Sequence, residues 1–347
     1  MLTLRDIADQ VGVSPSAVSL VLNDRDSGRV NSAVAERIRA VAAELGYVPN
    51  MLARGLRTKQ SQTLGLLADG LASSPFSGEM LSGAQEAAWA EGYLLMAIDV
   101  DHHAVMQPPA VRALMQRNIE ALIIAADFHR EVQMPFAPRS LPVVLLDAKP
   151  PADSDPDHPV DSVVPDEDGG AYAAVHHLIE VGHRRIGFLG VTDPRFVAAD
   201  QRRAGYRRAL QEAGLAPDPA LERYAPGPST LEGAAAAGEL VDRPDRPTAV
   251  FCFSDSLAMA CYQVANRLGL AVPHQLSVVG FDNQKAVADA LDPGLTTIQL
   301  PHRPMGAWAA AAAIRRMSDS GPVDGVEYLM PCPLVERGSV ATASPAP

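Results

Sequence analysis

Apolar residues recur at helical spacing near the N-terminus, and capping residues divide this stretch into three short helices. Thr3 is placed to cap the first helix and Gly12 to end it. Ser14 is placed to cap a second helix that starts with a proline, and Asn31 to cap a third helix that ends at Gly46. The apolar positions expected to face inward are Ile7, Ala8, Val11, Val18, Val21, Leu22, Val34, Ile38, Val41 and Leu45.

The pattern changes at Thr63, after which short apolar runs alternate with helical stretches in two blocks. Alternating strands and helices indicate parallel sheets covered on both faces. We therefore expect two doubly wound α/β subdomains, with a ligand in the cleft where the carboxyl ends of their strands lie. The expected strands cover 63–69, 93–99, 121–127, 142–148, 185–191, 248–255 and 276–282, and the expected helices end at Gly92 or cover 108–117, 168–181, 200–213 and 255–268.

The composition is typical of a globular protein with two or three domains: of 347 residues, 47% are hydrophobic and 20% charged. The three cysteines, Cys252, Cys261 and Cys332, lack CxxC spacing, which argues against a disulfide framework or a zinc cluster. No signal-peptide core and no run of about eighteen apolar residues occurs, so we expect a cytoplasmic protein.

The net charge of −12 argues against nucleic-acid binding only until it is divided along the chain. Residues 1–60 hold eight Lys and Arg against six Asp and Glu, a net charge of +2, whereas the remainder carries −14. This asymmetry indicates one end suited to phosphates and a body that repels them.

Only Gly12-Val13-Ser14 separates the first two expected helices. Two short helices joined by a three-residue turn with a glycine are typical of the helix-turn-helix motif. Residues 47–62 are polar at both ends and contain Pro49 and Gly55, so we expect a linker with a short helical turn inside it.

Motifs in a fixed order along nearly the whole chain resemble those of the lactose and galactose repressors, the LacI-GalR family. Near the N-terminus these motifs cover residues 3–8, 12–14, 18–23, 29–30, 45–50 and 53–58. Further on they cover residues 182–187, 202, 205–206, 254–255, 279–283 and 295–298. The chain is therefore identified as a member of this family.

The resemblance implies a three-helix helix-turn-helix DNA-binding domain over residues 1–48 and a hinge helix with its linker over 49–62. It implies a periplasmic-binding-protein-like core of two doubly wound α/β subdomains over 63–340, and 341–347 are expected to be a disordered tail. The expected subdomains are 63–160 with 293–325, and 161–292 with 326–340. Members of the family are homodimers that read a palindromic DNA operator, and a small molecule in the cleft shifts their affinity for DNA.

The second helix matches the recognition helix of the family, which offers its N-terminal side chains to the major groove. Ser16 can form a hydrogen bond to a base, whereas Pro15 and Leu20 offer apolar contact only. Many relatives carry arginine where this chain has Leu20, so their operator sequences cannot be transferred; the alternative that Leu20 belongs to the core stays open. Arg25 and Arg29 suit phosphate contacts. The predicted DNA-contacting residues of this domain are Thr3, Ser14, Pro15, Ser16, Ala17, Ser19, Leu20 and Arg29.

Residues 50–57 match the hinge helix, which in the family orders on DNA and pairs with its dimer mate in the minor groove. Leu56 stands where relatives insert a leucine between central base pairs. A helix of about eight residues that contains Gly55 is not stable alone, so we expect it to fold on DNA and to act as the switch. A plain linker is the alternative. The predicted DNA-contacting hinge residues are Asn50, Ala53, Arg54 and Leu56.

The resemblance places Arg202 and Asp282 in the ligand cleft. A guanidinium and a carboxylate that converge can hold neighbouring hydroxyl groups, as in sugar recognition, although a salt bridge without ligand is the alternative. Phe76 matches an aromatic side chain that stacks on the ligand, and Asp255 is expected to cap the helix that follows it. The predicted effector-binding residues are Phe76, Asp147, Phe196, Arg202, Ser254 and Asp282.

Other chemistry finds little support in the sequence. The pairs His102-His103 and His176-His177 are adjacent residues that point in different directions, which suits no metal. No GxSxG elbow, Walker loop or GxGxxG motif occurs. We therefore expect no enzyme activity, no cofactor and no metal.

The favoured function is a repressor of carbohydrate uptake or catabolism genes that binds its operator as a dimer and is released by a sugar or a sugar-derived inducer. One alternative is a solute-binding protein without a transcriptional role. Another is a regulator that needs a purine or sugar-phosphate corepressor, although Phe196 and Ala198 stand where some purine-binding relatives hold polar groups. Because no apolar heptad helix follows the core, we expect a dimer rather than a tetramer.

Overall fold

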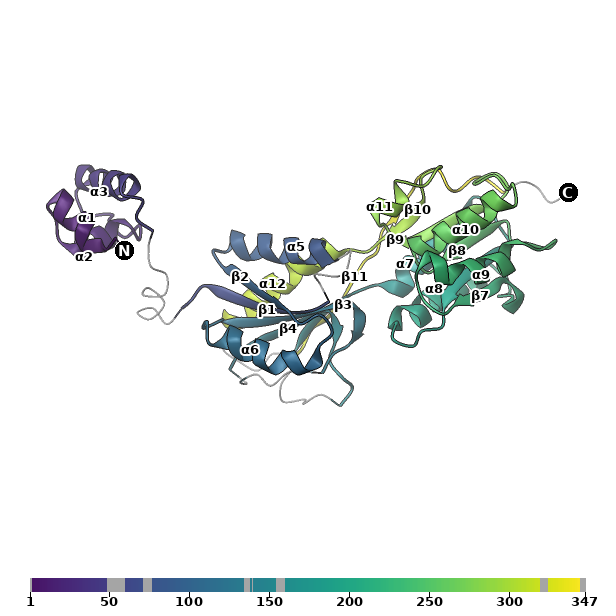
Figure 1. The fold of residues 1–347 in the computed structure, drawn as a ribbon, viewed down its shortest axis with the longest axis horizontal. Coiled ribbons are helices and arrows are strands. Elements are labelled where there is room, and N and C mark those ends of the chain that lie inside the picture. The colour runs from purple at the N-terminus through teal and green to yellow at the C-terminus, as the bar shows by residue number, and fades with distance from the viewer. Residues whose placement is uncertain are drawn as a thin grey trace. The chain divides into compact units, whose positions relative to one another are not determined.

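The computed structural model describes residues 2–48, 60–70, 77–133, 138, 140–153, 160–318 and 324–343. The chain divides into two compact units, residues 1–61 and residues 62–347 (Figure 1). The predicted change of texture near Thr63 therefore coincides with a boundary between units.

The described residues of the first unit form three helices that begin at the predicted caps. The Thr3 hydroxyl accepts the Asp6 N–H at 3.4 Å, and the Asp6 carboxylate accepts the Thr3 N–H at 2.7 Å, which completes a capping box. The Ser14 and Asn31 side chains accept backbone N–H groups at 3.2 and 3.0 Å. Gly12, at φ 79°, ends the first helix in the left-handed conformation. The helices are α1 (Leu4–Val11), α2 (Pro15–Val21) and α3 (Ser32–Glu44).

All three helices contribute to one small apolar core in this unit. Its buried members are Ile7, Ala8, Val18, Val21, Ala35, Ile38 and Ala42. Partly exposed side chains that pack against it include Val11, Leu22, Val34, Val41 and Leu45. The inward positions predicted from the periodicity are thereby confirmed, and two alanines of α3 join them.

Within the described residues, the second unit forms two six-stranded sheets. The strands of the first are β1 (Thr63–Asp69), β2 (Leu94–Asp99), β3 (Ala121–Glu131), β4 (Val143–Lys149), β5 (Asp161–Pro165) and β11 (Glu327–Met330). Those of the second are β6 (Ile186–Val191), β7 (Glu222–Ala225), β8 (Ala249–Cys252), β9 (Ser277–Asp282), β10 (Thr296–Gln299) and β12 (Leu334–Val335). The spatial orders are β11-β5-β4-β3-β1-β2 and β12-β10-β9-β8-β6-β7, and among the described pairs only β10 and β12 are antiparallel.

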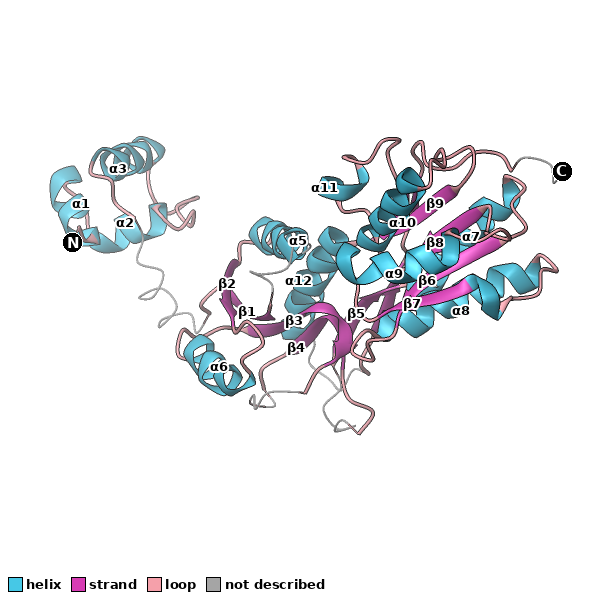
Figure 2. Cartoon of the chain, turned by 45° about the vertical axis from the view of Figure 1, so that its right-hand side comes forward, coloured by secondary structure: helices cyan, strands magenta, loops and turns pink. Residues whose placement is uncertain are grey.

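Helices cover both faces of each sheet, as Figure 2 shows. In the first sheet, α5 (Ser77–Ala90) and α12 (His302–Ser318) pack on one face and α6 (Gln107–Met115) on the other. In the second, α9 (Thr230–Val241) and α10 (Asp255–Arg267) lie opposite α7 (Glu167–Glu180) and α8 (Val197–Glu212). Shorter helices are α11 (Lys285–Ala288) and the 3₁₀ turns Ala104–Met106 and Pro219–Leu221. The predicted doubly wound arrangement is confirmed.

Each of the predicted strands and helices of this unit overlaps an observed one, but several elements, most of them short, were not predicted. β5, β7, β12 and α11 are brief and lie among prolines and charged residues, where periodicity gives little signal. β3 also continues beyond the expected end at residue 127 to Glu131. That extension carries side chains into the cavity described below.

The predicted subdomain boundaries need correction at all three crossings between the sheets. Residues 161–165, assigned to the C-terminal subdomain, form β5 of the first sheet. Residues 296–299, assigned to the N-terminal subdomain, form β10 of the second sheet, and 327–330 form β11 of the first. Each crossing falls a few residues later than expected, because a final strand pairs with the sheet before the chain leaves it.

The predicted disordered tail also begins too early. The Ala341 N–H donates to Ser277 Oγ at 3.1 Å, and the Ala343 N–H donates to the Val181 carbonyl at 2.9 Å. Residues 341–343 are thus fastened to the second sheet and to the end of α7, and residues 344–347 lie outside the described residues.

A buried carboxylate ties the returning chain to the first sheet. Asp161, at the start of β5, is fully buried and accepts hydrogen bonds from Arg315 and Arg316, each at 3.0 Å, and from the Val326 N–H at 2.9 Å. Burial acts to raise the pKa of Asp161, but these hydrogen bonds and the two positive charges hold the pKa below its usual value.

We predict that Asp161→Asn lowers the free energy of unfolding by about 2–4 kcal/mol at pH 7, because two arginines lose their buried partner. A carboxylate whose pKa is lower in the folded than in the unfolded state contributes to the free energy of unfolding above its unfolded pKa of about 4. This contribution is lost as the pH falls through the folded pKa. Urea denaturation of both proteins should therefore converge below about pH 4. Asp200→Asn, at an exposed carboxylate, is the control, and an unchanged gap at low pH would contradict this account.

Candidate functional site

The first unit presents the N-terminal part of α2 to solvent. Ser14, Pro15 and Ser16 are exposed, and Ala17 and Ser19 are partly exposed. Leu20 is also partly exposed and is not among the side chains that pack on the helical core, which supports its prediction as a contact residue. Thr3 and Arg29 are exposed as well.

An ion pair that the sequence did not predict fixes the loop after α2. Arg39 on α3 contacts both carboxylate oxygens of Asp26 at 3.0 and 3.1 Å. The loop between α2 and α3 carries Arg25 and Arg29, both exposed, as phosphate contacts require. The predicted hinge contacts Asn50, Ala53, Arg54 and Leu56 lie outside the described residues.

In the second unit, a cavity of about 310 Å³ brings together five predicted effector residues. They are Asp147, Phe196, Arg202, Ser254 and Asp282. The sixth, Phe76, lies outside the described residues. The volume falls at the lower end of the range of about 300–1,000 Å³ for small-molecule sites.

The cavity owes its position to the parallel sheets. Asp147 lies near the carboxyl end of β4, Asp282 ends β9, and Ser254 follows β8. Phe196 and Arg202 lie at the start and in the second turn of α8, which follows β6. These groups converge because parallel strands present their carboxyl ends at one edge of a sheet.

Arg202 is buried, with 4% of its side chain exposed, and is held on every side. Its Nε donates to Glu167 at 2.7 Å, and one terminal nitrogen donates to the Phe253 carbonyl and contacts Asp282 at 3.3 Å. The guanidinium carbon also lies 3.7 Å from the centroid of the Phe281 ring. The predicted pair of Arg202 and Asp282 is therefore present without a ligand, with Glu167 as a third member.

Asp282 has a strained backbone and a buried side chain. Its backbone φ is 114°, a region that residues other than glycine rarely adopt, and such strain often marks functional sites. Burial raises the pKa of Asp282 to about 8, with repulsion from Asp255 and Glu167 added and the nearby Arg202 acting against the rise.

Ser254, rather than Asp255, caps α10, which corrects the prediction. The Ser254 hydroxyl accepts the Leu257 N–H at 3.2 Å and donates to the Pro228 carbonyl at 3.1 Å. Asp255 instead accepts the Gln284 N–H at 2.7 Å and the Thr297 hydroxyl at 2.5 Å. Asp255 thus anchors the segment after β9, while the hydroxyl of Ser254 is already engaged.

Three cavity-lining polar atoms lack a hydrogen-bond partner among the described residues. They are Asp127 Oδ1, His129 Nδ1 and Asp147 Oδ1. Asp147 is 2% exposed, and burial, together with Glu167 and Asp127, raises its pKa well above the usual value. Burial lowers the pKa of His129 to about 4, so its imidazole is neutral at pH 7.

Phenyl rings form another part of the cavity wall. Phe128 and Phe196 lie 4.9 Å apart between ring centroids, and Phe196 and Phe253 lie 5.9 Å apart. Such rings suit the apolar face of a sugar ring or a planar heterocycle.

Several cavity residues were not predicted from the sequence. The largest group follows from the longer β3, and the others lie on α7, after β9 and at the start of α12: Asp127, Phe128, His129, Glu167, Gln284 and His302. Of these residues, only Asp127 could have been found from the sequence, because it ends an apolar run as Asp282 does.

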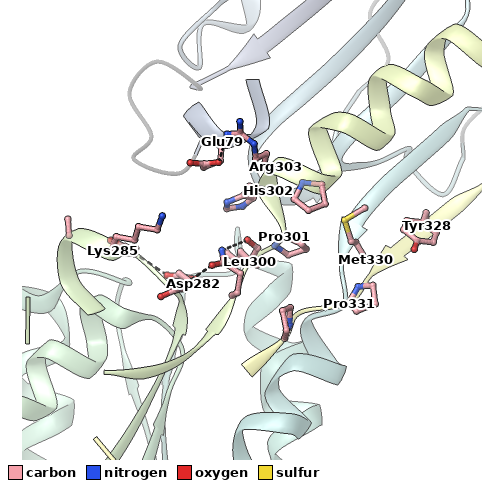
Figure 3. Close-up of a pocket in the computed structure, with 16 residues that line it drawn as sticks. Glu79, Asp282, Lys285, Leu300, Pro301, His302, Arg303, Tyr328, Met330 and Pro331 are labelled. Atoms are coloured by element: carbon pink, nitrogen blue, oxygen red, sulfur yellow. Dashed lines mark hydrogen bonds and ion pairs between the residues drawn. The ribbon is translucent and has the colours of Figure 1, made fainter. Parts of the chain in front are cut away.

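A second cavity of about 750 Å³ adjoins the first and shares Asp282, Gln284, Leu300 and His302 with it. Figure 3 shows Glu79 and Arg303 on one side of this space and Lys285 with Asp282 on the other. The first cavity therefore continues into a wider space beside the chain crossing at Leu300.

Known proteins match both units. The family model "Bacterial regulatory proteins, lacI family" matches residues 3–50, and the "Periplasmic binding protein-like domain" matches residues 175–340. The HTH-type transcriptional repressor PurR of Photobacterium profundum is 31% identical over 98% of this chain and 99% of its own. The HTH-type transcriptional regulator DegA of Bacillus subtilis is 32% identical over 88% of each chain, and the repressor CytR of Escherichia coli K12 is 31% identical over 97% and 96%.

Solved structures agree with these relatives. The lac repressor dimer bound to operator and the anti-inducer ONPF has a TM-score of 0.75 at 25% identity, over 98% of this chain and 99% of its own. The transcriptional regulator CelR in complex with cellobiose has a TM-score of 0.65 at 27% identity, over 98% and 100%.

A helix-turn-helix unit joined to a two-sheet ligand-binding unit defines a DNA-binding transcriptional regulator. The chain belongs to the LacI family of these bacterial regulatory proteins. Within the described residues, no helix is long and apolar enough to cross a membrane. The same part of the chain holds no group of three or more His, Cys, Asp or Glu residues arranged to bind a metal ion.

We predict that Leu20→Ala weakens operator binding by about 5- to 30-fold, since one good apolar base contact contributes about 1–2 kcal/mol. Because Leu20 does not pack on the helical core, thermal unfolding should not change. Val21→Ala, at a fully buried neighbour, is the matched contrast and should destabilise the first unit. Fluorescence anisotropy with circular dichroism measures both; loss of stability in Leu20→Ala would assign that residue to the core.

We predict that Arg202→Ala lowers the free energy of unfolding by about 3–5 kcal/mol at pH 8, because Glu167 and Asp282 lose their cation. A carboxyl group whose pKa is higher in the folded than in the unfolded state contributes most to the free energy of unfolding below its unfolded pKa. This contribution is lost as the pH rises through its folded pKa. The deficit should therefore shrink toward pH 5 in urea denaturation. Arg203→Ala, at the neighbouring partly exposed arginine, should change little, and a pH-independent deficit would argue against the charge account.

Proposed function

We propose that this chain represses carbohydrate uptake or catabolism genes by binding a palindromic operator as a homodimer in the cytoplasm, and that a sugar or sugar-derived inducer releases it. The proposal combines the family membership with the composition of the cavity. The observation that carries the ligand class is the row of buried acceptors beside phenyl rings. Hydroxyl groups donate to such acceptors, and ring faces of a sugar pack on such aromatics.

The charge of the cavity argues against a phosphorylated ligand. Four carboxyl groups of the described residues line it, from Asp127, Asp147, Glu167 and Asp282, and Arg202, the one arginine among these described lining residues, is already paired with two of them. A phosphate would bring further negative charge beside these carboxyl groups, and no unpaired arginine among the described lining residues would offset it. A neutral or positively charged ligand suits the lining better.

A purine corepressor is the second candidate, because the phenyl rings of Phe128 and Phe196 would also stack on a planar heterocycle. Relatives of this chain include repressors named PurR. Against this candidate, Phe196 and Ala198 contribute apolar groups to the wall where hydrogen-bonding groups would serve a purine.

The mechanism we propose connects the cavity to DNA through residues 50–57. Ligand bound between the two sheets changes the separation of the two N-terminal subdomains in the dimer, and this change controls whether the two hinge segments can pair in the minor groove. The ligand can shift this equilibrium only by the difference between its affinities for the two states.

The test is fluorescence anisotropy of the full chain on labelled palindromes from upstream of its own gene, at fixed salt. The panel should contain monosaccharides, disaccharides, sugar phosphates and purines. Release by a saccharide supports an inducible repressor, and tighter binding with a purine supports the corepressor candidate. Absence of any sequence-preferring DNA binding would contradict the proposal.

We predict opposite effects for two variants in this assay. Leu56→Ala should weaken operator binding at least about 10-fold and reduce DNA bending, because the inserted side chain offsets the cost of unstacking. Arg202→Ala should leave operator binding within about threefold of the original and abolish the response to ligand. The reversed pattern, in which the cavity variant loses DNA binding and the hinge variant loses only the response, would refute these roles.

A further inference from the structure

The three unpaired atoms of the cavity lie at one irregularity of the first sheet. β3 pairs with β4 regularly up to Ala125 and Leu146, and pairing resumes at Arg130 and Ala148. Residues 126–129 of β3 therefore face Asp147 alone on β4. Extra residues in one strand redirect side chains, and such bulges are frequent beside binding sites.

The backbone on the other strand supports the same arrangement. Asp147 has a φ of 54°, in the left-handed region that residues other than glycine rarely occupy. This conformation costs free energy, and it accompanies a nearly fully buried carboxylate whose Oδ1 has no hydrogen-bond partner. Asp127 and His129, from the bulge opposite, contribute the other two unpaired atoms.

The cations of this region are directed elsewhere. Arg202 donates to Glu167, Asp282 and a carbonyl group. Arg130 donates to Asp69 at 2.5 Å, and its Nε stays 3.8 Å from Asp127 Oδ1. Among the described residues, no positively charged side chain forms a hydrogen bond with Asp147.

A protonated primary amine matches this set of atoms. An ammonium group has three N–H donors and no acceptor. The site offers two carboxylate oxygens and Nδ1 of a neutral imidazole, which accepts a hydrogen bond when the ring is protonated on Nε2. A hydroxyl group has one donor and would leave two of these acceptors unpaired, at a cost for each buried group. The positive charge also offsets the repulsion between Asp127 and Asp147.

The aromatic wall favours the same ligand group. The rings of Phe128 and Phe196 adjoin the bulge, and ring faces attract cations within about 6 Å of their centroid. The remaining polar lining, which includes Gln284 and Asp282, suits hydroxyl groups.

Building on the proposed function, we infer that the effector is a hydroxylated primary amine of amino-sugar type, whose ammonium group binds Asp127, His129 and Asp147 at the β3 bulge. The sugar character comes from the proposed function, and the amine is the new element.

Binding of an ammonium group at this bulge is expected to depend on pH. The groups that face Asp147 are Glu167 on α7, Asp127 and Arg130 on β3, and Arg202 on α8. Burial and the neighbouring carboxylates raise the pKa of Asp147, so a proton competes with the cation for this carboxylate. Once the pH is low enough for the amine to be fully protonated, its affinity should fall as the pH is lowered further, whereas a neutral sugar should show no such loss.

The experiment is isothermal titration calorimetry of the full chain with matched pairs: glucosamine and glucose, galactosamine and galactose, mannosamine and mannose. We expect at least one amine to bind at least about 10-fold more tightly than its neutral partner at pH 7.5. Asp147→Asn and Asp127→Asn should each reduce the affinity for that amine by about 10- to 100-fold, as loss of a charged hydrogen bond does. Asp200→Asn, the same change at an exposed carboxylate, should have no effect, and thermal unfolding checks that the variants fold.

Two outcomes would overturn the inference. Equal or tighter binding of the neutral sugars would exclude an ammonium subsite while leaving the proposed sugar-released repressor intact. Failure of every amine in the panel to bind would also count against it. The proposed function fails separately, if the operator binding of the full chain does not respond to any saccharide, including one that the calorimeter shows to bind.

Discussion

The buried guanidinium of Arg202 is the group on which the cavity depends. A positive charge that is 96% removed from solvent requires carboxylates, and this chain supplies them from α7 and from the end of β9. The same guanidinium packs against the rings of Phe253, which directly follows β8, and Phe281, which lies in β9. One side chain thus joins two helices and two strand ends, and fixes one wall of the cavity.

Parallel topology explains why the remaining groups gather at the same place. Each sheet directs the carboxyl ends of its strands toward the cavity. Asp147 and Asp282 therefore line the same cavity, although they lie 135 positions apart in the sequence. The chain crosses between the sheets at β5, after β10 and after β11, and the buried ion cluster of Asp161 holds one of these crossings. A change in the angle between the lobes is therefore expected to act on the cavity and on these crossings together.

Much of this arrangement could be predicted from the sequence, for identifiable reasons. Capping residues and 3.6-residue periodicity located α1, α2 and α3, because short helices need their end groups satisfied. Apolar runs located the buried strands. The resemblance to a family, rather than any local pattern, selected Arg202 and Asp282 from the many charged residues of the chain.

What could not be predicted depends on contacts between distant segments. The late crossings follow from the pairing of β5 with β4 and β11 and of β10 with β9, which no local signal shows. The bulge at residues 126–129 depends on the register against β4, so the inward placement of Asp127 and His129 was missed. Asp255 was predicted to cap a helix and instead binds Gln284 and Thr297, since its partners come from β10 and the loop after β9.

The central claim is that occupancy of this cavity and occupancy of DNA by the first unit are coupled. Its most direct test is the affinity of the full chain for its effector, measured by calorimetry with and without saturating operator. Linkage requires that the operator change effector affinity by the same factor by which the effector changes operator affinity, about 5- to 150-fold for typical coupling. We expect effector affinity to fall by that factor when operator is bound. Equal effector affinity in the presence and absence of operator would contradict the account.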